Sequence, residues 1–245
     1  MKPYYQILIR DCGEPLVPIP LEQFAVESPH PYEKLGAPYG KTSPYHLRQT
    51  VLEALIAAQN DLQHRCPGWR ILIFDAYRPV AVQQFMVNYT FAEVARSHNL
   101  NPATLSETQR QMIWQQVYQI WALPSPDPLT PPPHSTGAAV DITLVNHKGE
   151  TIDMGSEIDE LSPRSDPDYY AKEWQLPYHA HRQLLRDIMQ KAGFQRHPGE
   201  WWHFCCGDQM WAWLCHQQNP SQRFIARYGR VAGVPPCSEE PGLPP

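Results

Sequence analysis

The sequence contains no long hydrophobic run. No stretch approaches the length of about 18 apolar residues that a membrane-spanning helix requires. The apolar run closest to the N-terminus, residues 7–9, is too short for the core of a signal peptide. These two absences predict a cytoplasmic protein without a membrane span.

The chain also lacks an excess of basic residues and a regular cysteine spacing. It carries 20 Lys and Arg against 25 Asp and Glu, and no basic run interrupts the resulting net charge of −5. Proteins that bind nucleic acids neutralise phosphates with basic side chains, so we expect no nucleic-acid partner. The six cysteines form no CxxC pair, which predicts free thiols in a reducing compartment.

Proline and tryptophan are abundant, with 27 and 8 residues in a chain of 245. A chain of this length fits one domain that buries a large core without disulfides. Proline limits regular structure, and it is concentrated in residues 12–44 and in the last eleven residues. We therefore expect an irregular N-terminal arm over residues 1–44, a main domain over residues 45–230 and a proline-rich tail over residues 231–245.

Periodic apolar residues predict helices and short β-rich runs predict strands. Ser106 and Gln109 have the spacing of a capping box, which marks a helix start. The expected helices cover residues 45–65, residues 79–99, a segment from Ser106 onward, and residues 179–192. The expected strands cover residues 4–9, 69–74, 138–145 and 200–204. Because helices and strands do not alternate regularly, we predict an α+β fold with a small, mainly antiparallel sheet.

Two polar residues frame the apolar strand of residues 138–145. His134 precedes it in a loop, and Asp141 lies inside it. A buried carboxylate must be paired or must bind a metal, and Gly137 leaves room for a close approach. The alternative is structural, with Asp141 capping a neighbouring loop and His134 in solvent.

A second pair, Glu200 and His203, encloses two tryptophans. Large apolar rings exclude water and raise the pKa of a carboxyl group, as a general base near neutral pH requires. On a flat strand the two side chains would point to opposite faces, so a strand here needs a bend or bulge. The alternative is a core edge anchored by the tryptophans.

Together, His134, Asp141 and His203 form a set of two histidines and one carboxylate. Three protein ligands leave one tetrahedral position open, the pattern of a catalytic Zn²⁺ site, and Glu200 is a candidate to accept a proton from water. Arg78 follows the predicted strand of residues 69–74 and is a candidate partner for a developing oxyanion. Its alternative role is a structural ion pair with Asp75.

These segments, FDAYRP, HSTGAAVDITL and EWWHF in this order, resemble the D-alanyl-D-alanine dipeptidases, the VanX-like branch of zinc peptidases. The resemblance covers residues 45–207, with weaker likeness upstream. It implies a catalytic zinc-peptidase domain that holds one zinc ion per chain on His134, Asp141 and His203. It further implies that Glu200 is the base and that Arg78 stabilises the transition state.

The resemblance also implies a substrate. The segment of residues 154–159 resembles the family segment whose final Asp binds the substrate ammonium, which implies that role for Asp159. The expected reaction is hydrolysis of the small dipeptide D-alanyl-D-alanine. Two alternatives stay open: a DD-carboxypeptidase or endopeptidase acting on peptidoglycan stem peptides, and a non-catalytic, zinc-stabilised binding domain.

The chain departs from the family pattern in two places. Pro132 replaces a serine two residues before His134, so a side-chain hydrogen bond is lost there. A proline-rich stretch, residues 24–39, replaces the family's usual upstream segment. In the family this upstream segment forms the outer wall of the substrate pocket, so we expect that wall to differ here.

Overall fold

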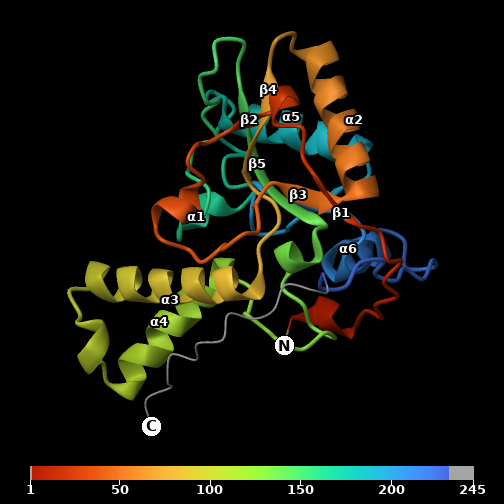
Figure 1. The fold of residues 1–245 in the computed structure, drawn as a ribbon. Coiled ribbons are helices and arrows are strands. Elements are labelled where there is room, and N and C mark those ends of the chain that lie inside the picture. The colour runs from red at the N-terminus through yellow and green to blue at the C-terminus, as the bar shows by residue number, and fades with distance from the viewer. Residues whose placement is uncertain (1, 232–245) are drawn as a thin grey trace.

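The computed structural model describes residues 2–231 and shows a mixed sheet surrounded by helices (Figure 1). The main sheet has five strands in the order β2-β4-β5-β7-β6, and all neighbouring pairs except β2 and β4 are antiparallel. These strands are β2 (Ala25–Val26), β4 (Arg70–Asp75), β5 (Ala139–Val145), β6 (Gln195–Arg196) and β7 (His203–Cys205). The α+β prediction with a mainly antiparallel sheet is confirmed. The predicted tail lies outside the described residues, apart from residue 231.

Two further strands form a separate antiparallel pair, β1 (Leu16–Pro18) and β3 (His46–Arg48). The helices are α1 (Pro31–Lys34), α2 (Gln49–Arg65), α3 (Val80–Ser97), α4 (Glu107–Ile120), α5 (Tyr178–Lys191) and α6 (Gln209–Gln218). Short 3-10 turns include η1 (Pro3–Gln6) and η4 (Pro133–Thr136). The domain boundaries expected from the sequence stay a prediction.

Local signals account well for several of these elements. The capping box at the start of α4 is present, because Ser106 and Gln109 each bond the other's backbone N–H. In β4, buried and half-buried residues alternate, which places Ile71, Ile73 and Asp75 on the inner face. Helix α3 begins directly after Pro79, whose fixed φ suits the entry to a helix.

Three predicted boundaries are wrong. Residues 3–6 form the turn η1 instead of a strand, and only Ile9 makes a bridge, to Ala226. The helix predicted from residue 45 begins at Gln49, because residues 46–48 pair with β1. The strand predicted over residues 200–204 is β7, which begins at His203 after a bend at residues 201–202. The arm expected to be irregular contains β1, β2 and α1, because β1 and β2 pair with strands distant in the sequence. The elements β6 and α6 were also not predicted.

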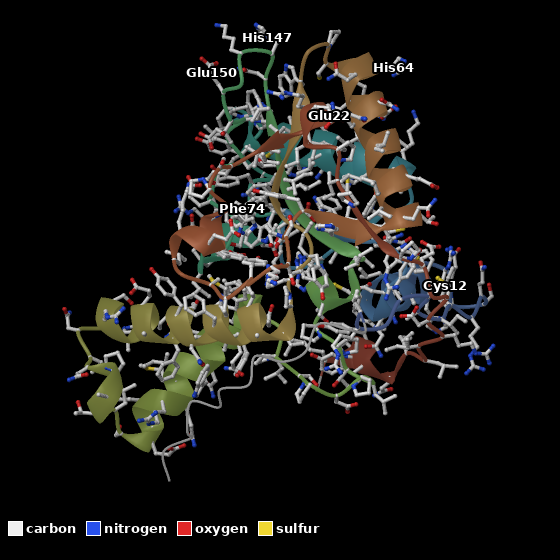
Figure 2. All side chains as sticks on the ribbon, in the orientation of Figure 1. Cys12, Glu22, His64, Phe74, His147 and Glu150 are labelled. Atoms are coloured by element: carbon white, nitrogen blue, oxygen red, sulfur yellow. The ribbon has the colours of Figure 1, made fainter. Side chains whose placement is uncertain are left out.

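Two large buried clusters, with a smaller third around Tyr4 and Met210, make up the interior of the described residues. The first lies where α2 and α5 pack against each other and against the sheet, and it contains Trp201 and Trp202. The second joins α3 and α4, which project as a pair from one end of the molecule (Figure 1), to the segment of residues 32–39. Phe74, labelled in Figure 2, lies beside α1, and its ring meets the ring of Tyr32 edge to face. The candidate active site lies between these two large clusters.

At the opposite end, the turn after β5 carries His147 and Glu150, which point into solvent (Figure 2). Within residues 2–231, none of the helices combines the length and the apolar character needed to cross a membrane.

Candidate active site

The register of the sheet places an imidazole and two carboxylates in one row. Asp141 in β5 lies opposite Asp75 at the end of β4 and opposite His203 at the start of β7. Residues directly opposite each other on antiparallel strands project from the same face. The pairing shifts by a bulge between Ile73 and Asp75, and bulges of this kind redirect side chains. The three side chains are therefore gathered at one end of the sheet.

His134 reaches the same place from η4, the turn that precedes β5. Its Nδ1 lies 2.7 Å from the carbonyl oxygen of Ala76. A carbonyl only accepts, so Nδ1 carries a proton and donates it, and Nε2 is the ring nitrogen that faces the cluster. Gly137 ends the turn with φ of 70°, and a Cβ at this position would lie 2.4 Å from the side chain of Leu16. This explains why the loop between His134 and Asp141 needs glycine.

The structure brings together His134, Asp141 and His203, whose donor atoms all lie within 4.8 Å of one another. His134 Nε2 is 3.2 Å from His203 Nδ1 and 3.1 Å from Asp141 Oδ2, and His203 Nδ1 is 2.9 Å from Asp141 Oδ1. In a tetrahedral zinc site with bonds of 2.0–2.2 Å, ligand atoms lie about 3.3 Å apart. Two imidazole nitrogens and a carboxylate, whose two oxygens each lie near one of the nitrogens, fit a zinc ion at this spacing.

The surroundings of this cluster keep Asp141 ionised. Burial by itself would raise the pKa of the Asp141 carboxyl, but the imidazoles of His134 and His203 hold that pKa well below its usual value. The second ring nitrogen of His203, Nε2, is buried and has no hydrogen-bond partner among the described residues. The cluster therefore holds a negative charge beside two inward-facing imidazole nitrogens.

Glu200 lies in the tight connection between β6 and β7. Its side chain is 9% exposed and stands 3.6 Å from Nδ1 of His197. Burial, reinforced by the negative charges of Asp141 and Asp159, raises the pKa of Glu200 well above its usual value. Burial and the neighbouring His203 lower the pKa of His197 to about 3, so this imidazole is neutral and does not offset the effect. A carboxyl group with a raised pKa holds a proton more tightly and is a stronger base once ionised.

The chain bends at residues 201–202, between Glu200 and His203. Trp201 and Trp202 are each 1% exposed, and their rings meet nearly at right angles. The Trp201 indole N–H donates to Ser156 Oγ at 2.8 Å. The expected bend therefore exists, and Glu200 and His203 line the same cavity.

Arg78 is buried beside the cluster and held by four protein partners. Its Nε donates to Asp75 and its Nη1 to Gln83, both at 2.8 Å. Its Nη2 donates to Tyr32 Oη at 3.2 Å and to Asp141 Oδ2 at 3.1 Å. A guanidinium has five N–H groups, so one N–H on Nη1 is left for another acceptor. The ion pair with Asp75, the alternative from the sequence, is also present.

Asp159 lies in the loop after β5, on a turn with φ of 62°. Tyr32 Oη donates to its Oδ2 at 2.6 Å. Burial and the charge of Asp141 raise the pKa of Asp159 to about 7. The residue shares the cavity with Arg78, Glu200 and the His134 cluster.

This cavity is open to solvent on one side. All six residues selected from the sequence line it. Sequence reasoning missed Lys2, His197, Gln83 and Tyr32, which lie in or directly behind the cavity wall. None of these four residues belongs to a motif of regular spacing. Gln83 could have been found, because it lies one turn into α3, five residues after Arg78.

The departure at Pro132 leaves the turn intact. The Pro132 carbonyl accepts from the backbone N–H of Ser135 at 2.9 Å and from its hydroxyl at 2.7 Å. The second departure, residues 24–39, places Tyr32 against both Arg78 and Asp159.

Comparison with known proteins gives the chain its family. A family model described as peptidase M15, D-ala-D-ala dipeptidase, matches residues 25–223. The D-alanyl-D-alanine dipeptidase of Synechocystis sp. is 54% identical over 241 residues, covering 94% of this chain and 97% of that protein. The enzyme of the same name from Escherichia coli is 32% identical over 143 residues, covering 56% and 55%. The one from Enterococcus faecium is 28% identical over 167 residues, covering 67% and 73%. This chain belongs to the D-ala-D-ala dipeptidase family of M15 peptidases.

Proposed function

We propose that this protein is a zinc-dependent dipeptidase that hydrolyses D-alanyl-D-alanine to two molecules of D-alanine. The observation that carries the proposal is a single cavity lined by the His134, Asp141 and His203 cluster, a buried carboxyl group with a raised pKa, and a second carboxylate at Asp159. Such a cavity offers a place for each part of a small dipeptide with a free amino group.

In this proposal, His134 Nε2, Asp141 and His203 Nδ1 hold one zinc ion, which supplies Lewis-acid activation of water and of the scissile carbonyl. Glu200 takes a proton from the attacking water and delivers it to the leaving amino group. The raised pKa of Glu200 suits both transfers, because a group that binds a proton strongly can accept it and still release it to an amine. The indoles of Trp201 and Trp202 keep bulk water away from this carboxyl group.

Arg78 supplies positive charge where the carbonyl oxygen becomes negative. Within residues 2–231, one N–H of its Nη1 has no acceptor, and Asp75, Gln83 and Asp141 fix the orientation of the guanidinium. A fixed donor stabilises a developing charge without reorganising. Asp159 receives the substrate ammonium, and this charge pair orients the dipeptide relative to the zinc ligands.

Replacing Arg78 with alanine is expected to lower kcat by about 10²–10³ while KM changes by less than tenfold, because its partner charge develops mainly in the transition state. Steady-state kinetics with D-alanyl-D-alanine measures both constants. A large rise in KM with a normal kcat would instead make Arg78 a ground-state clamp for the substrate.

Substrate length separates this proposal from the carboxypeptidase alternative. A carboxypeptidase accepts a long acyl chain and has no use for a carboxylate that captures a free amino group two residues from the C-terminus. N-acetylation of D-alanyl-D-alanine removes the positive charge and leaves Asp159 without its partner. A charge-assisted hydrogen bond contributes about 1.5–3 kcal/mol, so we expect kcat/KM to fall by about 10–10²-fold.

The measurement compares kcat/KM for the free and the N-acetylated dipeptide in wild-type enzyme and in Asp159→Ala. The variant should show a higher KM for the free dipeptide. It should also show a smaller ratio of kcat/KM for the free over the N-acetylated dipeptide. Equal cleavage of both substrates by wild-type enzyme would favour the carboxypeptidase. Absence of D-alanine release with zinc present would favour the zinc-stabilised binding domain. The cytoplasmic location stays a prediction.

A further inference from the structure

The hydroxyl group of Tyr32 joins two groups of the proposed site. It donates to Asp159 Oδ2 at 2.6 Å and accepts from Arg78 Nη2 at 3.2 Å. A phenol has one proton to donate and lone pairs to accept with, so both bonds form at once. Burial raises the pKa of Tyr32 well above its usual value, and the group therefore stays a neutral phenol and keeps its proton. These bonds connect residues 32, 78 and 159, which are far apart in the sequence.

The ring of Tyr32 is itself held rigidly. The residue is 2% exposed, and its ring packs edge to face on Phe74 and His30 and lies 5.9 Å from the ring of Trp121. His30 caps α1 by accepting the backbone N–H of Tyr32 at 3.2 Å, and its other ring nitrogen lies 3.2 Å from Asp75. A side chain packed on several sides cannot change rotamer freely. Its hydroxyl is therefore a fixed point directly behind the cavity wall, bonded to Asp159 and Arg78, which line the cavity.

Asp159 has no comparable support of its own. It lies in a loop, on a turn with φ of 62°, a conformation that costs energy for a residue other than glycine. Among residues 2–231, Tyr32 is the hydrogen-bond partner found for its carboxylate. The direction of the Asp159 side chain into the cavity therefore depends on this one bond.

We propose that Tyr32 is the positioning residue for recognition of the substrate amino group: its hydroxyl holds the Asp159 carboxylate in the cavity and thereby makes the enzyme select peptides whose amino group is free. This inference rests on the proposed function, and it assigns part of the substrate selectivity to residues 24–39, the proline-rich stretch that contains α1. Arg78 keeps Asp75, Gln83 and Asp141 when the Tyr32 hydroxyl is absent. The chemical step is therefore less dependent on this hydroxyl than substrate selection is.

The test is Tyr32→Phe, which removes the hydroxyl and keeps the ring. We expect KM for D-alanyl-D-alanine to rise about tenfold, and the ratio of kcat/KM for the free over the N-acetylated dipeptide to fall about tenfold, with a smaller change in kcat. This ratio compares two substrates on one sample, so it does not depend on the fraction of enzyme that is folded. Tyr32→Met, which also lacks the hydroxyl and has a flexible side chain that can fill the space, is the second variant with the same expectation.

Tyr39→Phe is the matched control. Tyr39 is a tyrosine of the same segment, 4% exposed, and its hydroxyl donates to Asp75 at 3.1 Å instead of to Asp159. This variant is expected to keep the free-to-acetylated ratio of the wild type. A fall of the ratio in Tyr39→Phe equal to that in Tyr32→Phe would show a general packing effect and overturn the proposal.

A double variant tests the route of the effect. If Tyr32 acts through Asp159, then Tyr32→Phe in an Asp159→Asn background lowers the ratio no further. An additional fall of full size would overturn the proposal, as would an unchanged ratio in both Tyr32 variants. If wild-type enzyme itself shows no preference for the free dipeptide, the proposed function fails. If wild-type enzyme has the preference and Tyr32→Phe retains it, only the role of Tyr32 fails.

Discussion

Replacing Glu200 with glutamine is expected to remove nearly all hydrolysis while the protein keeps its fold and its zinc. Glutamine has almost the same shape, so Trp201 and Trp202 can remain packed as they are, but an amide cannot accept the proton of the attacking water. General base catalysis contributes about 10²–10⁴-fold, and the orientation of the water is lost as well. We expect kcat to fall by at least about 10³-fold.

The burial of Glu200 also predicts how its replacement by glutamine affects stability. The wild-type carboxyl group has a raised pKa because it is buried and lies near Asp141 and Asp159. Glutamine carries no charge, so it removes a costly buried ionisation, and the variant should be no less stable than the wild type. A lower activity therefore cannot be attributed to unfolding if thermal denaturation gives an equal or higher Tm.

The measurement pairs kcat for D-alanyl-D-alanine with zinc content per chain. Glu53→Gln is the control, because Glu53 is an exposed carboxylate on α2 whose partner is Gln49, on the same helix. It should leave kcat unchanged. A loss of less than about tenfold in Glu200→Gln would exclude Glu200 as the general base.

Removing one ligand of the histidine and aspartate cluster is the second change with a large expected effect. His134→Ala or Asp141→Ala eliminates one of only three protein donors, and catalytic zinc sites rely on three. We expect zinc content to fall from about one ion per chain to a small fraction of that, and activity to fall with it. Treatment of wild-type enzyme with a chelator should remove activity in the same way, and added zinc should restore it.

His197→Ala provides the control for this experiment. His197 lines the same cavity and its ring lies 5.7 Å from that of His203, but it is not part of the donor cluster. Zinc content should therefore stay at the wild-type level in this variant. Unchanged zinc content in both His134→Ala and Asp141→Ala would refute the assignment of the metal ligands.

Patterns among neighbouring residues correctly predicted the helices and strands that are set by short-range interactions. The start of α4 depends on Ser106 and Gln109, which are three positions apart. The side chain of each accepts a hydrogen bond from the backbone N–H of the other. Strand β4 and helix α3 were predicted because β4 is an apolar run and α3 follows Pro79 directly. One boundary that failed depends on a distant partner: residues 46–48 become a strand only because β1, about 30 positions earlier, pairs with them.

The sequence by itself determined the residue types of the site: a motif with His134 and Asp141, another with Glu200 and His203, and Arg78 at a strand end. Only the tertiary structure decided how they meet. Asp141 lies opposite both Asp75 and His203 because three antiparallel strands adopt one register, and a shift of one residue would turn these side chains to the other face. Tyr32 reaches Asp159 across 127 positions of the chain. No local pattern encodes such a contact, because its energy exists only once the intervening segments have packed and brought the two groups together.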